Sequence, residues 1–108
     1  MSDGAYALGG APDHYGTVWM VPLANALEWR VFDDEFLVYN PASGQTHHLN
    51  LLAGEALRSL ETEAAHTQEL IRRLADQFEI AEDSPSLQMI DRLVREFDEL
   101  GLIAPSTA

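Results

Sequence analysis

The sequence contains no cysteine, no lysine and no long apolar run among its 108 residues. Without cysteine it can form neither a disulfide framework nor a thiolate metal site, which is typical of proteins from a reducing compartment. No apolar run approaches the roughly 18 residues that a membrane span needs. The N-terminus also lacks the basic and apolar regions of a secretory signal. These absences predict a cytoplasmic, single-domain protein with no membrane segment.

Positive charge is scarce as well. The chain has 18 acidic residues and six basic ones, all of them arginine, for a formal net charge of −12. A field of this sign repels phosphate backbones, so we expect no nucleic-acid partner. The acidity either serves solubility alone or steers a basic partner toward the protein. Both interpretations stay open.

The chain divides into a central domain and two short ends. Residues 1–17 hold four of the seven glycines and show no apolar periodicity, so they predict a flexible N-terminal tail. Residues 18–104 predict the folded domain, and 105–108 predict a C-terminal tail that begins at Pro105. Trp19 to Pro22 is expected to be extended, with Pro22 restricting it to an edge or lead-in segment.

The first half of the domain predicts a β-meander. β-branched and aromatic residues favour strands near 28–32, 36–40 and 45–49. Turn residues separate the strands at Asp33–Asp34 and at Pro41–Gly44. Trp29 opens the first strand and shares a face with Val31, so we expect it to anchor the core.

Three helices are expected after the meander. Asn50 predicts the cap of the first helix, Thr67 that of the second, and Ser84-Pro85 the start of the third. A polar loop over 61–66 separates the first two helices, and Gly101 ends the third in a left-handed conformation. The predicted buried faces are Leu52, Ala53, Ala56, Leu57 and Leu60, then Leu70, Ile71, Leu74, Ala75 and Phe78. The fold class predicted is therefore α+β and winged-helix-like.

The third helix carries an apolar arc about 160° wide, made of Met89, Leu100, Leu93, Phe97, Ile90, Val94 and Leu87. Either this helix lies between two others, or one margin of the arc lines a groove for a partner. The strand 45–49 ends the sheet and lacks proline, so its edge can pair with another chain. Alternate residues of such a strand direct their N–H groups outward. The residues that would hydrogen-bond to an added peptide are therefore either 46 and 48 or 47 and 49. The predicted peptide-binding residues are Thr46, His47, His48, Leu49, Leu87, Ile90, Leu93 and Val94.

No residue pattern indicates catalysis or metal binding. His47 and His48 are adjacent in a strand and point to opposite faces, so they cannot chelate one ion. The paired carboxylates lie at turns and helix ends, and there is no nucleophile elbow, phosphate loop or dinucleotide motif. We therefore predict no enzyme, no metal and no cofactor. The exposed side of the third helix has two positive and four negative residues, the wrong balance for a DNA-recognition helix.

The residues at the tightest points of the chain resemble the PqqD family of peptide chaperones, or RiPP recognition elements. More narrowly, they resemble the PqqD-family chaperones of the HPr-rel-A system. The matching residues are Trp19, Pro22, Trp29, Val38–Pro41, Ser43–Gly44, Thr46–His47, Leu49–Asn50 and Gly101–Leu102. The resemblance implies that the leader peptide of a precursor binds as an added strand on the third strand, against the third helix. One departure is His48, where the family usually has an apolar residue.

The resemblance and the residues together predict a non-catalytic chaperone that presents a ribosomal precursor peptide to a maturation enzyme. One alternative is a winged-helix regulator that binds DNA. Another is an adaptor subunit of an HPr-kinase-related protein. The chain is expected to be a monomer or a homodimer, and the identity of the peptide is not encoded in these patterns.

Overall fold

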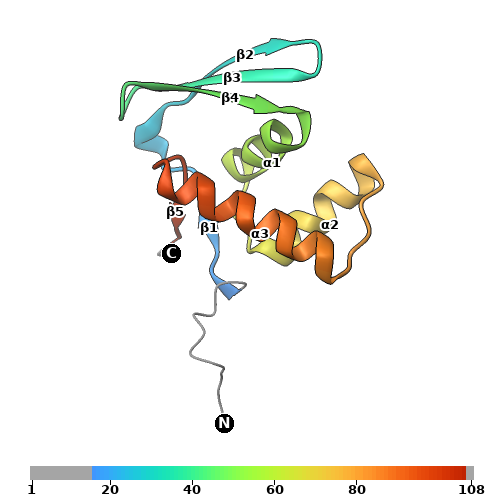
Figure 1. Ribbon diagram of the computed structural model, residues 1–108. Helices are drawn as coiled ribbons and strands as arrows, with labels where there is room; N and C mark the ends of the chain where they lie inside the picture. Colours follow the sequence, from blue (N-terminus) through green and yellow to red (C-terminus); the bar gives the residue numbers. More distant parts are fainter. Residues whose placement is uncertain (1–15, 107–108) are drawn as a thin grey trace.

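The computed structural model describes residues 16–106, so residues 1–15 of the predicted N-terminal tail lie outside the described part (Figure 1). The predicted α+β architecture, a three-stranded antiparallel meander followed by three helices, is confirmed. Its elements are β1 (Trp19–Met20), the 3-10 helix η2 (Leu23–Asn25), β2 (Glu28–Phe32), β3 (Glu35–Asn40), β4 (Gln45–Asn50), α1 (Leu51–Thr62), α2 (Thr67–Phe78), α3 (Ser84–Glu99) and β5 (Ala104–Pro105).

The meander has the strand order β2-β3-β4, and two turns of different length set its register. Asp33, with φ of 50°, belongs to a two-residue loop that places Phe32 opposite Glu35. The longer loop ends at Gly44, whose φ of 74° suits glycine. Asn40 organises this loop, because its carbonyl accepts the Gly44 N–H at 2.8 Å and its side chain accepts the Ala42 N–H at 3.0 Å.

One face of the sheet packs on α1. Phe36, Val38 and Leu49 are buried there, and Gly54 of α1 leaves the space that the Phe36 ring occupies. Trp29, expected to anchor the core, is instead only half-buried at the rim of this face. Its ring meets Phe36 edge-on with centroids 5.7 Å apart, and its Nε1 donates to Glu61 at 3.1 Å. The expectation was wrong because β2 is an edge strand, so Trp29 has a neighbouring strand on one side only.

The helix ends follow sequence rules with two corrections. Asn50 caps α1 as predicted, since its side chain accepts the Ala53 N–H at 2.8 Å. The second cap is His66, whose Nδ1 accepts the Glu69 N–H at 3.1 Å, so the predicted cap at Thr67 is wrong. Thr67 is the first helical residue and is fully buried. Helix α3 is capped by Asp83, one residue before the expected start.

The C-terminal end of α3 is confirmed. Gly101 has φ of 78° and donates to the Asp98 carbonyl at 3.0 Å, while Leu102 donates to the Phe97 carbonyl at 2.9 Å. These two bonds form a Schellman motif, which satisfies carbonyls that the helix leaves free. The chain reverses at this motif and returns toward β1.

A second, two-stranded sheet was not predicted. β1 and β5 pair antiparallel, with Trp19 opposite Pro105, so Pro105 is not the start of a free tail. Trp19 also exchanges two backbone hydrogen bonds with Ala65, at 2.8 and 3.0 Å. The lead-in segment is thus extended as expected, and it ties the α1–α2 connection to the C-terminal strand.

The core lies where the sheet and the three helices meet. Its fully buried side chains include Val38, Leu57, Leu60, Leu70, Leu74, Ile90, Val94, Phe97 and Leu102. Asn25 joins this region from η2, because its Nδ2 donates to the carbonyls of Gly101 and Leu102 at 3.1 and 3.3 Å. Within residues 16–106, no helix is long and apolar enough to cross a membrane.

Candidate functional site

A cavity of about 390 Å³ lies between the edge strand β4 and the helix α3. Its lining from β4 and α1 consists of Thr46, His47, His48, Leu49, Asn50 and Ala53. The second half of α3 and its C-cap provide the rest. The α3 residues are Leu93, Glu96, Phe97 and Leu100. Four predicted site residues of β4 and one of α3 therefore meet in one place.

The register of the sheet decides which backbone groups of β4 face outward. A two-residue hairpin loop closes on a hydrogen-bonded pair, here Phe32 with Glu35. Alternation along β3 then directs the backbone of Phe36 and Val38 toward β4, where they face Leu49 and His47. The N–H groups of His47 and Leu49 are thus expected to bond inward, and those of Thr46 and His48 to point away from β3.

Nothing in the described part of the chain covers this edge. β4 has no sheet neighbour except β3, and no backbone hydrogen bond joins Thr46 or His48 to another element within residues 16–106. The strand also lacks the proline and bulges by which proteins usually protect an edge. The edge is therefore open to a further strand.

Three of the predicted α3 residues lie elsewhere. Ile90 and Val94 are completely buried in the core, so the structure does not bring them to the groove. Leu87 lines a different cavity, of about 350 Å³, between α2 and the start of α3. The groove uses the opposite margin of the apolar arc, because α2 occupies the margin that contains Leu87.

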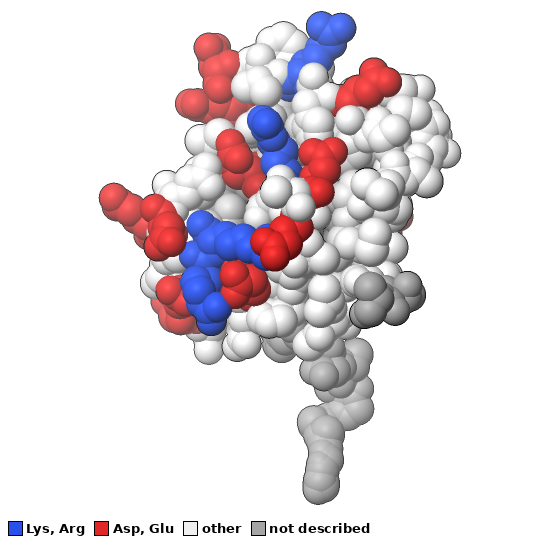
Figure 2. Space-filling view, turned by 180° about the vertical axis from the view of Figure 1, so that it is seen from behind, with Lys and Arg blue, Asp and Glu red and all other residues white. Residues whose placement is uncertain are grey.

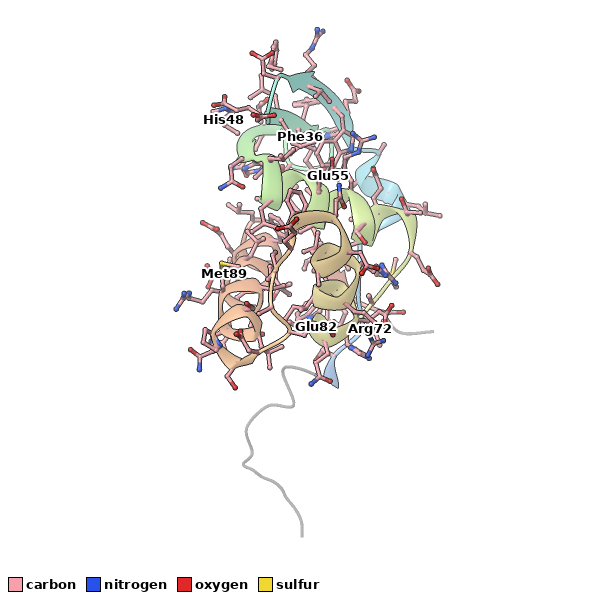
Figure 3. All side chains as sticks on the ribbon, turned by 90° about the vertical axis from the view of Figure 1, so that its right-hand side faces the viewer. Phe36, His48, Glu55, Arg72, Glu82 and Met89 are labelled. Carbon is pink, nitrogen blue, oxygen red and sulfur yellow. The ribbon has the colours of Figure 1, made fainter. Side chains whose placement is uncertain are left out.

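A second cavity, of about 590 Å³, continues the groove beyond the end of β4. It shares Asn50, Ala53, Leu93 and Glu96 with the first cavity. It adds Leu52, Met89, Arg92, Arg95 and Glu99. We call the two together the β4–α3 groove. Figure 3 shows His48 and Met89, near its two ends, on the same side of the molecule.

Sequence reasoning missed several residues of this groove. Met89, Glu96 and Leu100 were missed, and with the predicted Leu93 they follow each other at spacings of four, three and four, which places them on one stripe of α3 and its C-cap. This spacing could have found the stripe, but it could not show which margin of α3 faces β4. Ala53 was predicted as core only, and it is buried while also lining both cavities.

The polar groups of the groove differ in burial and in their partners. His47 lines the first cavity and is half-buried, and its Nε2 has no hydrogen-bond partner within residues 16–106. His48 lies 2.6 Å from Glu35, and both side chains are exposed. Arg95 pairs with Asp91 at 3.1 Å. Among the described residues, no group of three or more His, Cys, Asp or Glu side chains could hold a metal ion.

The face opposite the groove differs in character. Figure 2 shows acidic and basic side chains interspersed on that face. There Arg72 and Arg73 of α2 form ion pairs with Glu69, at 2.6 and 3.6 Å. Such a solvated, mixed surface gives no single sign of charge to a nucleic acid.

The fold and the groove define a small α+β domain whose last meander strand and last helix flank an open sheet edge. This arrangement is similar to a solved structure, that of TbiB1 in complex with the TbiA(beta) leader peptide, with a TM-score of 0.63. The match covers 82% of this chain and 99% of the TbiB1 chain at 13% sequence identity, so it concerns the fold. No protein-family model matches the sequence, and no curated protein matches it either.

Proposed function

We propose that this protein is a non-catalytic peptide-binding module that takes up an extended leader segment of a ribosomal precursor as an added strand on β4. The observation that carries the proposal is the free edge of β4 opening on the apolar stripe of α3. In strand addition, main-chain hydrogen bonds supply affinity, and pockets for alternate side chains supply specificity.

The parts of the groove suit these two roles. The N–H and C=O groups of Thr46 and His48 offer the backbone ladder. Leu93 and Leu100, both half-buried on α3, offer apolar contact to every second side chain of the peptide. The solved structure with the same fold contains a leader peptide, which supports a ligand of this class.

The proposal includes a second partner. As a non-catalytic module, the protein would act on a peptide by presenting it, and a modifying enzyme would carry out the chemistry. The resemblance to the PqqD family indicates a maturation enzyme, or in its narrower branch an HPr-kinase-related protein. Arg92 and Glu99, which are both exposed, line the part of the groove beyond β4 and are available to such an enzyme.

A proline scan tests the strand addition. The probe is a peptide selected from a displayed library of random extended peptides on the wild-type protein. The TbiA(beta) leader peptide serves as a second probe. We expect Thr46→Pro and His48→Pro to weaken binding at least about tenfold without unfolding the domain, because proline has no N–H. In contrast, His47→Pro is expected to destabilise the sheet.

The opposite sheet edge provides the matched control. Val31 lies in the edge strand β2, is 55% exposed and is also expected to direct its N–H outward. Val31→Pro should therefore leave peptide affinity unchanged in calorimetric titration. If folded Thr46→Pro and His48→Pro proteins both keep wild-type affinity, the peptide does not bind as a strand on β4.

The two margins of α3 test the groove independently. Leu93 and Leu87 are both half-buried leucines of α3, but only Leu93 lines the β4–α3 groove. We expect Leu93→Glu to weaken binding at least about tenfold and Leu87→Glu to leave it nearly unchanged. A reversed result would place the peptide on the α2 side of the helix.

The same purified protein distinguishes the two alternative functions, a DNA-binding regulator and an adaptor subunit. A regulator that binds DNA would bind a duplex of about 20 base pairs with a steep salt dependence, measurable by fluorescence anisotropy. An adaptor that acts through its helices would yield no peptide in the selection. Either result would overturn the proposal.

A further inference from the structure

The sheet has a second open edge, formed by β2. Register and alternation direct the backbone of Glu28, Arg30 and Phe32 toward β3, and hence that of Trp29 and Val31 outward. Neither of these two N–H groups makes a hydrogen bond to another element within residues 16–106. Val31 is 55% exposed and Phe32 is 52% exposed, so apolar surface accompanies the free backbone groups.

This edge is unlike the one at β4. α1 contacts β2 through Arg58 and Glu61, which meet Trp29. A cavity of about 440 Å³ is lined by Glu28, Trp29 and Arg30 of β2 and completed by Leu37, Tyr39 and Thr46 of the same sheet. The edge thus offers backbone pairing beside a cavity that is formed by the sheet alone. A flat edge of this kind is suited to a strand that brings its own complementary side chains.

We propose that the β2 edge pairs with β2 of a second copy of this chain, antiparallel and around a two-fold axis at Trp29. The two three-stranded sheets would then join into one sheet of six strands. An isologous contact of this type requires each strand to be complementary to itself. The sequence Glu28-Trp29-Arg30 meets this requirement, because an acid and a base flank the axial residue symmetrically.

The charges select this register among the three that align the outward-facing residues. With the axis at Trp29, Glu28 lies opposite Arg30 of the second copy, and the pair occurs twice. With the axis at Arg30, two arginines lie directly opposite, which is destabilising. With the axis at Val31, Arg30 lies opposite Phe32 and Glu28 lies opposite Asp34 of the turn, so no pair of opposite charges forms.

The charges on the α1 side of the proposed junction are balanced too. The two Trp29 rings would lie next to each other, and aromatic cross-strand pairs are favourable. Arg58, whose guanidinium lies 5.6 Å from the Trp29 ring, and Glu61, which accepts its Nε1–H, add one charge of each sign per copy. On the outer face, Glu28 and Arg30 are exposed and form no ion pair within residues 16–106.

The dimer would be weak and concentration-dependent. A contact of one short strand per copy belongs to the small, transient class of interfaces. Two chains of net charge −12 also repel each other, and about 0.15 M salt screens this repulsion beyond roughly 8 Å. The β4–α3 grooves would lie at the two far edges of the joined sheet, so one dimer would bind two peptides.

Charge exchange tests the proposal by sedimentation equilibrium at about 0.15 M salt, over a protein range from micromolar to millimolar. Glu28→Arg and Arg30→Glu are each expected to weaken association at least about tenfold, because like charges then lie opposite. The double variant, which carries both changes, restores the complementary pairs and should regain wild-type association. Both residues are exposed, and circular dichroism verifies that each variant is folded.

Disulfide trapping tests the register directly, since the chain has no cysteine of its own. Glu28→Cys protein is mixed with Arg30→Cys protein under oxidised glutathione. In the proposed register the two thiols lie opposite each other, and the mixed pair also keeps one Glu28–Arg30 contact. The mixed disulfide should therefore exceed its statistical share. Predominant cross-linking of Arg30→Cys to itself would place the axis at Arg30 and overturn the proposal.

Three other results would also overturn it. The first is a wild-type protein that stays monomeric at millimolar concentration. The second is an association that Thr46→Pro abolishes but that Val31→Pro and both single charge changes leave unaffected. The contact would then lie at β4. The third is a dimer that fails to dissociate on dilution, which indicates exchange of whole elements. None of these measurements depends on a peptide, so they stand apart from the proposed function.

Discussion

Gly54 is the residue on which the contact between sheet and helix depends most directly. A Cβ at this position would lie 2.0 Å from Cδ2 and 2.5 Å from Cε2 of the Phe36 ring. Alanine is the better helix former by about 1 kcal/mol. The clash outweighs this gain, because the ring is 2% exposed and has no room to move. Gly54→Ala is expected to destabilise the protein by about 1–3 kcal/mol in urea unfolding.

A double-mutant cycle separates the clash from other effects. In the Phe36→Ala background the ring is absent, so Gly54→Ala should become neutral or stabilising by up to about 1 kcal/mol. If Gly54→Ala costs the same with and without the ring, the glycine is required for another reason.

Residue roles of this kind are only partly visible in the sequence. Asn50 and Gly101 could be predicted, because capping and left-handed geometry depend on a few neighbouring residues. Gly54 could not, since its partner lies in a strand 18 positions away. His66 was missed as a cap because the adjacent Thr67 has the stronger capping preference. Tertiary packing overrode that preference by burying Thr67 completely.

At the scale of elements, Asn25 connects η2 to the end of α3. It is 7% exposed, and its Nδ2 donates to two carbonyls, those of Gly101 and Leu102. Asn25→Asp replaces the donor Nδ2 by a carboxylate oxygen, which accepts hydrogen bonds and cannot donate to these two carbonyls. We expect a loss of about 2–3 kcal/mol in the free energy of unfolding, because buried carbonyls lose their donor.

Leu23→Ala, on the same 3-10 turn but 92% exposed, is the control and should cost under about 0.5 kcal/mol. Equal losses in both variants would show that the amide contacts contribute nothing.

Arg73 connects α2 to the end of α1. Its guanidinium donates to the carbonyls of Ser59, Glu63 and Ala64 at 3.5, 3.0 and 3.4 Å, and to the Ser59 hydroxyl at 3.0 Å. Ser59 also accepts the Glu63 N–H, whereas Glu63 and Ala64 follow the helix, so this side chain mainly holds the α1–α2 connection against α2. Arg73→Met is expected to cost about 1–3 kcal/mol.

The neighbouring Arg72 is the control for this prediction. Its side chain is 64% exposed and makes one ion pair, with Glu69 at 2.6 Å. Arg72→Met should therefore cost under about 0.5 kcal/mol in the same thermal or urea unfolding experiment. A cost for Arg73→Met as small as that for Arg72→Met would show that the Arg73 contacts do not stabilise the connection.

The helices and strands themselves were predicted better than which of them pair or pack together. Turn chemistry and apolar periodicity located the meander and the three helices to within a few residues, because these signals are local. The β1–β5 pair was missed, since two residues at each end of a domain carry no periodicity. For the same reason the sequence could define the apolar arc of α3 but not which margin faces β4. The packing of α2 against α3 makes that choice.

At the scale of the whole molecule, the sheet has two free edges with different surroundings. β4 borders the groove with α3, whereas β2 borders a cavity that is formed by sheet residues alone. We assign peptide recognition to the first edge and self-association to the second. The two functions then use separate backbone groups, so peptide affinity should be independent of the oligomeric state.

Net charge acts over the whole molecule and predicts which peptides bind fastest. A chain of net charge −12 attracts basic ligands, and such fields raise association rates by about tenfold or more at low ionic strength. A selected peptide with four lysines added outside the bound segment should associate about tenfold faster at about 0.01 M salt than its counterpart with four glutamates. Near 0.15 M salt the difference should largely vanish, because the Debye length falls from about 30 to about 8 Å. Dissociation rates should match, since the added residues make no contact. Stopped-flow fluorescence measures both rates, and equal association rates at low salt would show that the acidity serves solubility alone.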